Sequence, residues 1–190
     1  MTAVRAVFAG FDRNAMQFWH ELAGEMSRPW FAANQQRYHN LWLTPMTVLL
    51  DDVARRLAPA YRPLKLGAPG VLRIHRDLRF ARDKTPYKTH IAGVIRIAGV
   101  AGAPGAALLP IISRLREAGY TVGAHDHYKR LPGGFAPDHP RAELLKMKGL
   151  TCAFPEIPAG LLHKPAWADW LVRHATAAAR LVIWLHRHVG

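Results

Sequence analysis

The centre of the chain reads Val71-Leu-Arg-Ile-His-Arg-Asp-Leu-Arg-Phe80, followed by Ala81-Arg-Asp-Lys-Thr-Pro-Tyr-Lys-Thr-His90. It combines strand-forming apolar residues with six Lys or Arg, two Asp and two His. Apolar residues share one parity in 72–80, apart from Arg76, and polar residues share the other, as in a strand with one buried face. Residues 81–89 are expected to form a loop whose course is set by Pro86. With a second strand over 90–97, the segment predicts an antiparallel hairpin with a long, basic loop.

Helical periodicity flanks this hairpin. Residues before 59 repeat apolar side chains at three- and four-residue steps, which predicts a first helix and then two helices, or one kinked helix, over 29–58. The candidate N-caps are Asp12 or Asn14, Ser27 and Thr44. Residues 59–69 are rich in turn-forming residues and are expected to be a connector, and the Ala/Gly/Pro run 98–106 is expected to be a loop.

The C-terminal half predicts further short elements and one long helix. Helices are expected over 107–118 and, with Asp138 as its cap, over 139–148. Residues 119–137 are mainly loop with one strand, and 150–154 are a candidate strand. Residues 165–188 form a clean amphipathic pattern.

The predicted fold class is α+β, with N-terminal helices and a long C-terminal helix packed on a small antiparallel sheet. A length of 190 residues fits one domain over 1–190. Within it we expect a helical part over 1–58, a basic strand-loop-strand over 71–97, and a loop and helical part over 107–188.

The chain is strongly basic, with a formal charge of +13 and a pI of about 10.7. Such a balance favours anionic partners, above all nucleic acid or another polyanion. The alternative is a compositional origin, because 19 Arg against 7 Lys with abundant Ala fits GC-rich codon usage. The charge is distributed evenly along the chain. Residues 1–95 contain 14 basic and 7 acidic side chains, and residues 96–190 contain 12 basic and 6 acidic ones, which excludes a separate basic tail.

Cysteine content and hydropathy indicate the cellular compartment of the protein. The single cysteine, Cys152, allows no disulfide within the chain and no cysteine-based metal site. It lies in an apolar run and is expected in the core. The N-terminus does not resemble a signal peptide, and the longest uncharged run, between Arg96 and Arg114, is broken by glycines and prolines. We therefore expect a cytoplasmic protein without a membrane span, and no cofactor is predicted.

The central stretch resembles the signature of the Domain of Unknown Function 2461 family. The family pattern R-I-x-R-D-x-R-F-x-x-D-K-x-P-Y-K-T-H is matched at every fixed position by residues 73–90. Gly10-Phe11 with Trp30-Phe31 is similar to the family's opening, and Pro132-Gly-Gly-Phe135 with Asp138-His-Pro140 is similar to its C-terminal box. The family usually carries aromatic-rich strands between its boxes, where this chain has the run 98–110, so a shortened form is expected. The resemblance implies no particular activity.

The polar residues of these boxes are the candidate site. Guanidinium and ammonium groups bind phosphate or carboxylate groups, and Asp77 and Asp83 could orient them. Tyr87 and His90 could position a ligand. The candidate ligand-binding residues are Arg73, Arg76, Arg79, Lys84, Tyr87, Lys88, His90, Lys129, Arg130 and His139. In the alternative, the same charges form a salt-bridged scaffold in which a buried Arg76 pairs with Asp77 or Asp83.

The sequence contains none of the common catalytic motifs. Asp77, Asp83, Lys84 and His90 are the candidates for catalysis, and the first three loosely resemble the acid-plus-lysine chemistry of some metal-dependent nucleases. His125 and His127 are too few for a metal site, and none is predicted. The tryptophans fall on helical core patterns, with Trp19 as the exception. Three hypotheses remain open: a module that binds an anionic ligand, an enzyme acting on a phosphorylated or nucleic-acid substrate, and a structural or assembly protein.

Overall fold

The computed structural model describes residues 6–79, 82–98, 108–124, 126–131, 133–140, 142–147 and 150–188. Its contacts divide the chain into two compact units. Unit 1 comprises Met1–Gly99 and Ile157–Ala175, and unit 2 comprises Val100–Glu156 and Thr176–Gly190. The long C-terminal helix, α6 (Ala166–His188), contributes residues to both. The assignment of 1–190 to one domain stays a prediction.

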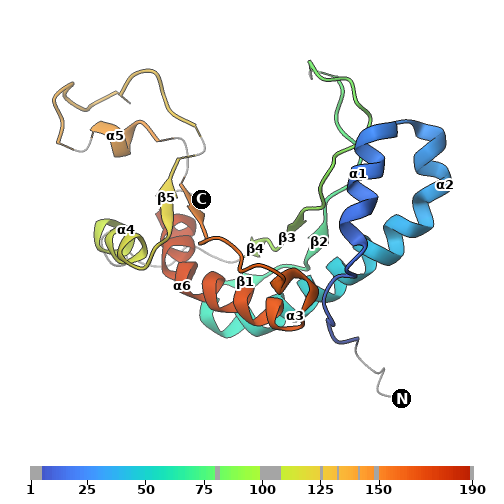
Figure 1. Cartoon of the computed structure of the whole chain (residues 1–190). Helices are drawn as coiled ribbons and strands as arrows, with labels where there is room; N and C mark the ends of the chain where they lie inside the picture. Colours follow the sequence, from blue (N-terminus) through green and yellow to red (C-terminus); the bar gives the residue numbers. More distant parts are fainter. Residues whose placement is uncertain are drawn as a thin grey trace. The chain divides into compact units, whose positions relative to one another are not determined.

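Unit 1 begins with consecutive helical segments, labelled α1, α2 and α3 in Figure 1. They are α1 (Ala15–Glu25), α2 (Arg28–Tyr38), a π-helical turn η1 (His39–Leu43), α3 (Thr44–Leu57) and a 3-10 turn η2 (Ala58–Tyr61). The predicted cap Ser27 is confirmed, because its hydroxyl accepts the backbone N–H of Trp30 at 3.3 Å. The side chains of Asp12 and Asn14 do not cap α1 in this way: Asp12 Oδ1 accepts the N–H of Asn14, which itself makes no side-chain cap.

The predicted cap at Thr44 is wrong, because the chain stays helical there. Thr44 has φ −64° and ψ −51°, and its N–H donates to the carbonyl of His39. A proline has no N–H for the regular helical hydrogen bond, and a π-turn is one way in which a helix accommodates such an interruption. The helical path therefore passes through Pro45 without a break.

Aromatic side chains form much of the core of unit 1. Phe18 has no exposed surface, and Trp19, the exception to the predicted stripe, is only 6% exposed. Trp19 lies between its neighbour Phe18 and Trp42, at ring-centroid distances of 5.2 Å from each. Trp42 Nε1 also donates to the carbonyl of Ala15 at 3.0 Å. Trp19 is therefore a core residue.

The start of α6 and the turn before it belong to the same unit. In the 3-10 turn η3 (Leu161–His163), the carbonyl oxygen of Leu162 accepts a hydrogen bond from the N–H of Phe11 at 3.0 Å. Gly10 has φ +101°, and a Cβ there would lie 2.4 Å from the backbone of His163. Only glycine therefore allows this approach. Arg56 and Asp169 form an ion pair of 2.6 Å between α3 and α6.

The antiparallel hairpin predicted over 71–97 is confirmed, but its strands are short. Strand β1 (Lys65–Leu66) pairs with β4 (Ile97–Ala98), and β2 (Gly70–Val71) pairs with β3 (Gly93–Val94). An isolated antiparallel bridge joins His75 to Tyr87. The three sets of partners lie in nearly the same register, so the described residues of 65–98 form a single irregular ribbon. Strand β1 lies in the segment predicted as a connector.

The alternating pattern overstates how much of this ribbon is buried. Ile74 is buried at 6% exposure, whereas Leu72, of the same parity, is 42% exposed. Phe80 lies outside the described residues. The ribbon packs on α3 near its base, where a Cβ on Gly93 would lie 2.5 Å from Leu50 Cδ1.

Unit 2 contains α4 (Leu108–Glu117), β5 (Thr121–Gly123), α5 (Ala142–Leu145), β6 (Thr151–Ala153) and the rest of α6. The strands pair antiparallel, with Val122 opposite Cys152. Five buried residues form its core: Ile112, Leu115, Tyr120, Val122 and Leu181. Cys152 packs against this core, as expected, and burial raises the pKa of its thiol. Helix α5 is shorter than the predicted 139–148: it begins at Ala142, so the predicted cap at Asp138 is wrong, and a turn follows at Lys146.

The fold class is therefore α+β, as predicted, with several helices, a long C-terminal helix and small antiparallel sheets. None of the helices described has the length and apolar character that crossing a membrane requires. The expected loop over 98–106 lies almost wholly outside the described residues.

Candidate functional site: a basic hairpin arm

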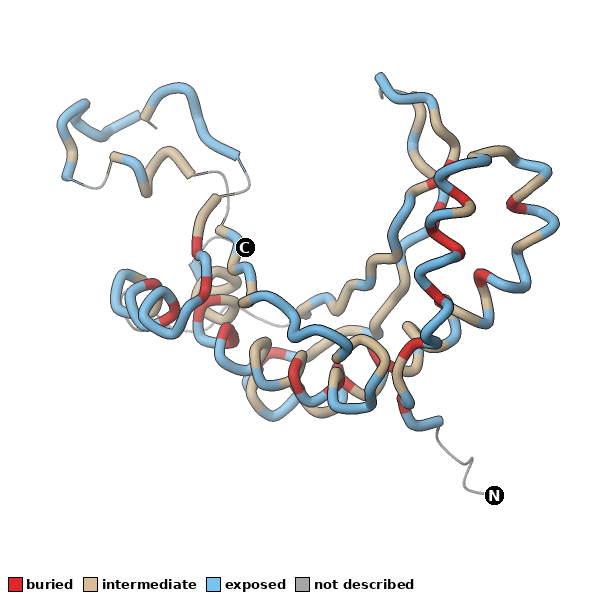
Figure 2. Tube along the Cα trace, viewed as in Figure 1, coloured by how far each residue is buried: buried red, intermediate tan, exposed pale blue. Residues whose placement is uncertain are grey.

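We define the basic arm as the described residues of 72–90, which extend beyond β2 and β3. Backbone hydrogen bonds close its lower part: Leu72 N–H donates to Ala92 O at 2.8 Å, Lys88 N–H to Ile74 O at 2.9 Å and Arg76 N–H to Pro86 O at 3.0 Å. The tube in Figure 2 is pale at the end of the arm, where Arg82, Asp83 and Lys84 are exposed.

Tyr87 anchors the arm to the helices. It is 4% exposed, and its ring stacks on Phe31 of α2 with centroids 4.5 Å apart and an interplanar angle of 28°. The ring of His75 lies 5.2 Å from that of Tyr87 on the ribbon itself. The structure therefore places Tyr87 in the core of unit 1. The sequence pattern did not single out Phe31 as its partner.

Asp77 gathers two of the candidate arginines. Arg79 binds its carboxylate with two bonds, Nε to Oδ1 at 3.0 Å and Nη2 to Oδ2 at 2.7 Å. Arg73 Nη2 lies 3.9 Å from the same Oδ2. The hydrogen bond from Arg79 lowers the pKa of Asp77, and the same bond raises the pKa of Arg79. Two guanidinium groups are thereby brought to one carboxylate.

Asp83 closes the end of the arm. Its Oδ1 accepts the backbone N–H of Thr85 at 2.9 Å, and its Oδ2 lies 2.8 Å from Arg76 Nη1. The hydrogen bond from Thr85 is the main reason that the pKa of Asp83 is lowered, and the charge of Arg76 adds to it. Arg76 was expected to be buried and paired with Asp77 or Asp83. It pairs with Asp83, but its side chain is 35% exposed.

The two lysines of the motif bind backbone oxygens. Lys84 Nζ donates to Leu78 O at 2.8 Å, and Lys88 Nζ donates to Arg73 O at 2.9 Å. These bonds tie one side of the arm to the other. An ammonium bound to a carbonyl keeps its positive charge, so both lysines contribute to the field of the arm.

The arm remains cationic after these pairings. The sequence of the arm contains six Lys or Arg but only two Asp. The Arg73 and Arg79 side chains are 69% and 77% exposed, and His90 is also exposed. Arg82, which belongs to the motif but not to the candidate ligand set, is exposed and forms no ion pair within the described part of the chain. Its place at the end of a charged hairpin could have marked it as a candidate.

The acidic candidates are poorly suited to proton transfer. A general base works best with a pKa near the working pH, which for a carboxyl group requires an upward shift. Asp77 and Asp83 are shifted downward and are occupied by hydrogen bonds and ion pairs. Their geometry supports orientation of arginines rather than acid–base chemistry.

The C-terminal candidates belong to unit 2, whereas the arm belongs to unit 1. Lys129 and Arg130 are exposed. His139 is half-buried, with its ring 5.4 Å from that of Phe135. His125 lies outside the described residues, so its pairing with His127 is not part of the structure.

The fold and the arm together define an α+β protein with a salt-bridged, cationic hairpin. The model of a family of conserved hypothetical proteins, DUF2461, matches residues 14–114 and 104–184. The matches cover most of the chain, including the arm, and the chain therefore belongs to the DUF2461 family. No curated protein and no solved structure matches it.

Proposed function

We propose that the protein binds the phosphate groups of a polyanion, with nucleic acid as the expected partner, through the basic arm. The observation that carries the proposal is the pair of exposed guanidinium groups that Asp77 gathers. Arg79 uses two of its five N–H donors on this carboxylate, so three remain for a ligand. Guanidinium groups that are already oriented lose less freedom on binding.

The arrangement of charge supports an extended anion over a small one. The cations are distributed along both sides of the arm, from Arg73 to Lys88, and the arginine side chains at Arg73 and Arg79 are largely exposed. Repeated phosphates can neutralise several such side chains at once, releasing counterions. Contacts of this kind position a nucleic acid without reading its sequence. The single free cysteine is compatible with a reducing, cytoplasmic setting, which we include in the proposal.

A second candidate function is assembly, in which the arm meets an acidic protein surface. The internal pairing of Arg76 with Asp83, and of Arg79 with Asp77, supports it, because these ion pairs also serve a rigid scaffold. Catalysis has less support, since the acidic candidates have lowered pKa values.

The test is the affinity for a fluorescein-labelled single-stranded oligonucleotide, measured by fluorescence anisotropy at about 50 mM salt. The arm variant Arg73→Gln/Arg82→Gln removes two exposed charges. The control Lys65→Gln/Arg96→Gln removes two exposed charges near the opposite end of the same ribbon. We expect binding about tenfold weaker for the arm variant and nearly unchanged for the control. Absence of binding by the wild type, or equal losses for both variants, would overturn the proposal, and the assembly function would then be the better candidate.

A further inference from the structure

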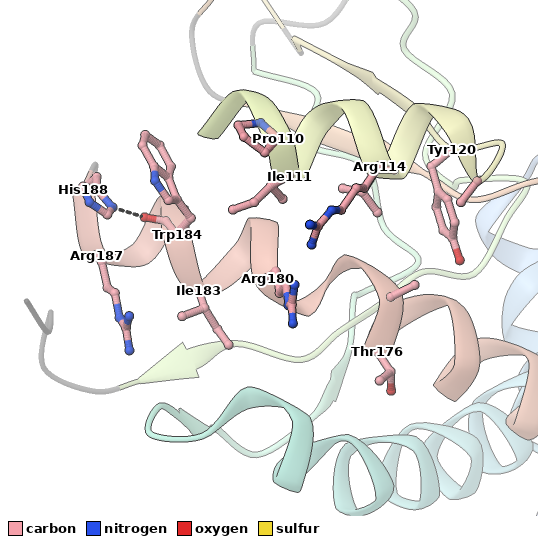
Figure 3. A pocket seen from close by; sticks show the side chains of 13 residues that line it. Pro110, Ile111, Arg114, Tyr120, Thr176, Arg180, Ile183, Trp184, Arg187 and His188 are labelled. Carbon is pink, nitrogen blue, oxygen red and sulfur yellow. Dashed lines mark hydrogen bonds between the residues drawn. The ribbon is translucent and has the colours of Figure 1, made fainter. Parts of the chain in front are cut away.

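Unit 2 contains a cavity of about 610 Å³ between α4 and the last turns of α6. Its lining from α4 recurs at helical steps, and so does its lining from α6, which means that each helix contributes one continuous stripe. Small side chains, Ala118, Thr176 and Ala177, leave room at one end. Figure 3 shows the two helices with the labelled side chains that line the space between them. A cavity of this size is within the range that small-molecule sites occupy.

The charged side chains of this cavity are all cationic. Arg114 comes from α4, and Arg180 and Arg187 come from α6, while none of the described residues that line the cavity is Asp or Glu. None of the three arginines forms an ion pair with any residue that the structure describes. The buried Nε of Arg187 also has no hydrogen-bond partner within the described residues. A buried donor without a partner is costly and calls for an explanation, and an anionic ligand would provide one.

The rest of the lining is mostly apolar. Ile111 and Leu115 contribute from α4, and Ile183 and Trp184 from α6. The Trp184 ring stacks on that of His188, with centroids 4.3 Å apart and an interplanar angle of 13°. His188 Nδ1 lies 2.7 Å from Trp184 O, the contact drawn as a dashed line in Figure 3. The cavity therefore has an apolar wall whose aromatic end is held in place.

We propose that this cavity binds a small amphipathic carboxylate, whose apolar body lies against Ile111, Ile183 and Trp184 and whose carboxylate meets the arginines. The guanidinium fork matches the geometry of a carboxylate, and the described lining residues, which include three arginines and no acidic residue, favour an anionic ligand over a cationic one. This site belongs to unit 2 and is independent of the basic arm in unit 1. A protein partner could place an acidic amphipathic helix here, but the size of the cavity and its single-sign charge favour the small ligand.

Calorimetric titration of the 190-residue protein with decanoate tests the proposal, with decanamide as the uncharged ligand of equal length. Decanoate is expected to bind at least about tenfold more tightly than decanamide, because only the carboxylate forms charge-assisted hydrogen bonds. The double variant Arg180→Gln/Arg187→Gln should abolish this preference. The control Arg173→Gln, which changes an exposed arginine of α6 outside the cavity, should keep it.

A second variant separates loss of the site from loss of the fold. Ala177→Phe places a large ring in the cavity from an exposed helix position, and it should weaken decanoate and decanamide alike while the circular dichroism spectrum stays that of the wild type. Equal affinity for the two ligands, or decanoate binding that survives Ala177→Phe, would overturn the proposal. Failure of decanoate with binding of an acidic amphipathic peptide would also overturn it and assign the cavity to a protein partner.

Discussion

Arg76 and Asp83 form an ion pair of 2.8 Å across the end of the basic arm. Arg76 lies on the side of the arm that leaves β2, and Asp83 lies at the end of the arm, where the chain turns back toward β3. The same carboxylate accepts the N–H of Thr85 at 2.9 Å, so one aspartate joins the turn to the opposite side. Ordering of the arm therefore depends on charged groups as well as on the backbone bonds below them.

We expect Arg76→Gln to loosen the end of the arm without unfolding the protein. Exposed ion pairs contribute little to global stability, so the melting temperature should stay close to that of the wild type. The amide protons of Thr85 and Lys88 should exchange faster with solvent, because the carboxylate that organises the turn loses its counter-charge. Hydrogen exchange followed by NMR measures both sites. Unchanged exchange would show that the pair does not order the arm.

The carboxyl group of Asp77 should titrate below its ordinary pKa of 3.8, because Arg79 hydrogen-bonds its ionised form. A lowered pKa in the folded state means that this contact favours folding above the unfolded pKa and loses that effect as the pH falls through the folded value. In Arg79→Gln the pKa of Asp77 should rise toward 3.8. The pKa of Asp83 should not change, because it is lowered mainly by the hydrogen bond from the backbone N–H of Thr85. NMR titration of the side-chain carboxyl carbons measures both, and equal shifts at the two aspartates would contradict the assignment of separate partners.

The stacked pair of Phe31 and Tyr87 should be the main attachment of the arm to the helices. Both are nearly fully buried, and Phe31→Ala should cost about 3 kcal/mol in the free energy of unfolding. The exposed Phe135→Ala is the control and should cost less than about 0.5 kcal/mol. In a double-mutant cycle with Tyr87→Ala, the coupling should be about 1 kcal/mol. Denaturant unfolding supplies the four free energies, and additivity would show that the rings do not stabilise each other.

Gly93 should be sensitive to a single added methyl group. In Gly93→Ala the new Cβ would meet Leu50 Cδ1 at 2.5 Å, which forces a shift that should cost about 1 kcal/mol. Gly70→Ala, on the partner strand, serves as the control, because no atom of the described residues lies within 4 Å of its new Cβ. In a Leu50→Ala background the cost at Gly93 should disappear. Thermal unfolding measures the series, and equal effects at the two glycines would contradict the close approach of the ribbon to α3.

Local signals in the sequence predict much of this fold. Ser27, two residues before Pro29, marks the start of α2. The apolar stripe of 165–188 predicts α6 nearly to its ends. The hairpin follows from the two apolar runs on either side of Pro86. In each case the information lies within a few residues, where helix capping, periodicity and turn chemistry act.

The features that sequence reasoning missed depend on tertiary neighbours. Strand β1 is held by the backbone of β4, and no pattern in its two residues marks it. Tyr87 lies in a motif that predicts ligand contact, but its burial is decided by Phe31, far away in the sequence. The choice of Asp83 over Asp77 as the partner of Arg76 follows from the course of the turn. The two arginine positions on α6 seven residues apart, Arg180 and Arg187, share a helix face, a signal that could have marked the cavity in unit 2.

The salt dependence of oligonucleotide binding tests the central claim most directly. The logarithm of Kd is measured against the logarithm of the KCl concentration between about 50 and 200 mM, by the anisotropy assay above. We predict a steep dependence for the wild type, a slope smaller by about 1 to 2 for Arg73→Gln/Arg82→Gln, and an unchanged slope for Lys65→Gln/Arg96→Gln. A Kd that does not depend on salt, or the same slope in all three proteins, would contradict the claim that the arm binds phosphate groups.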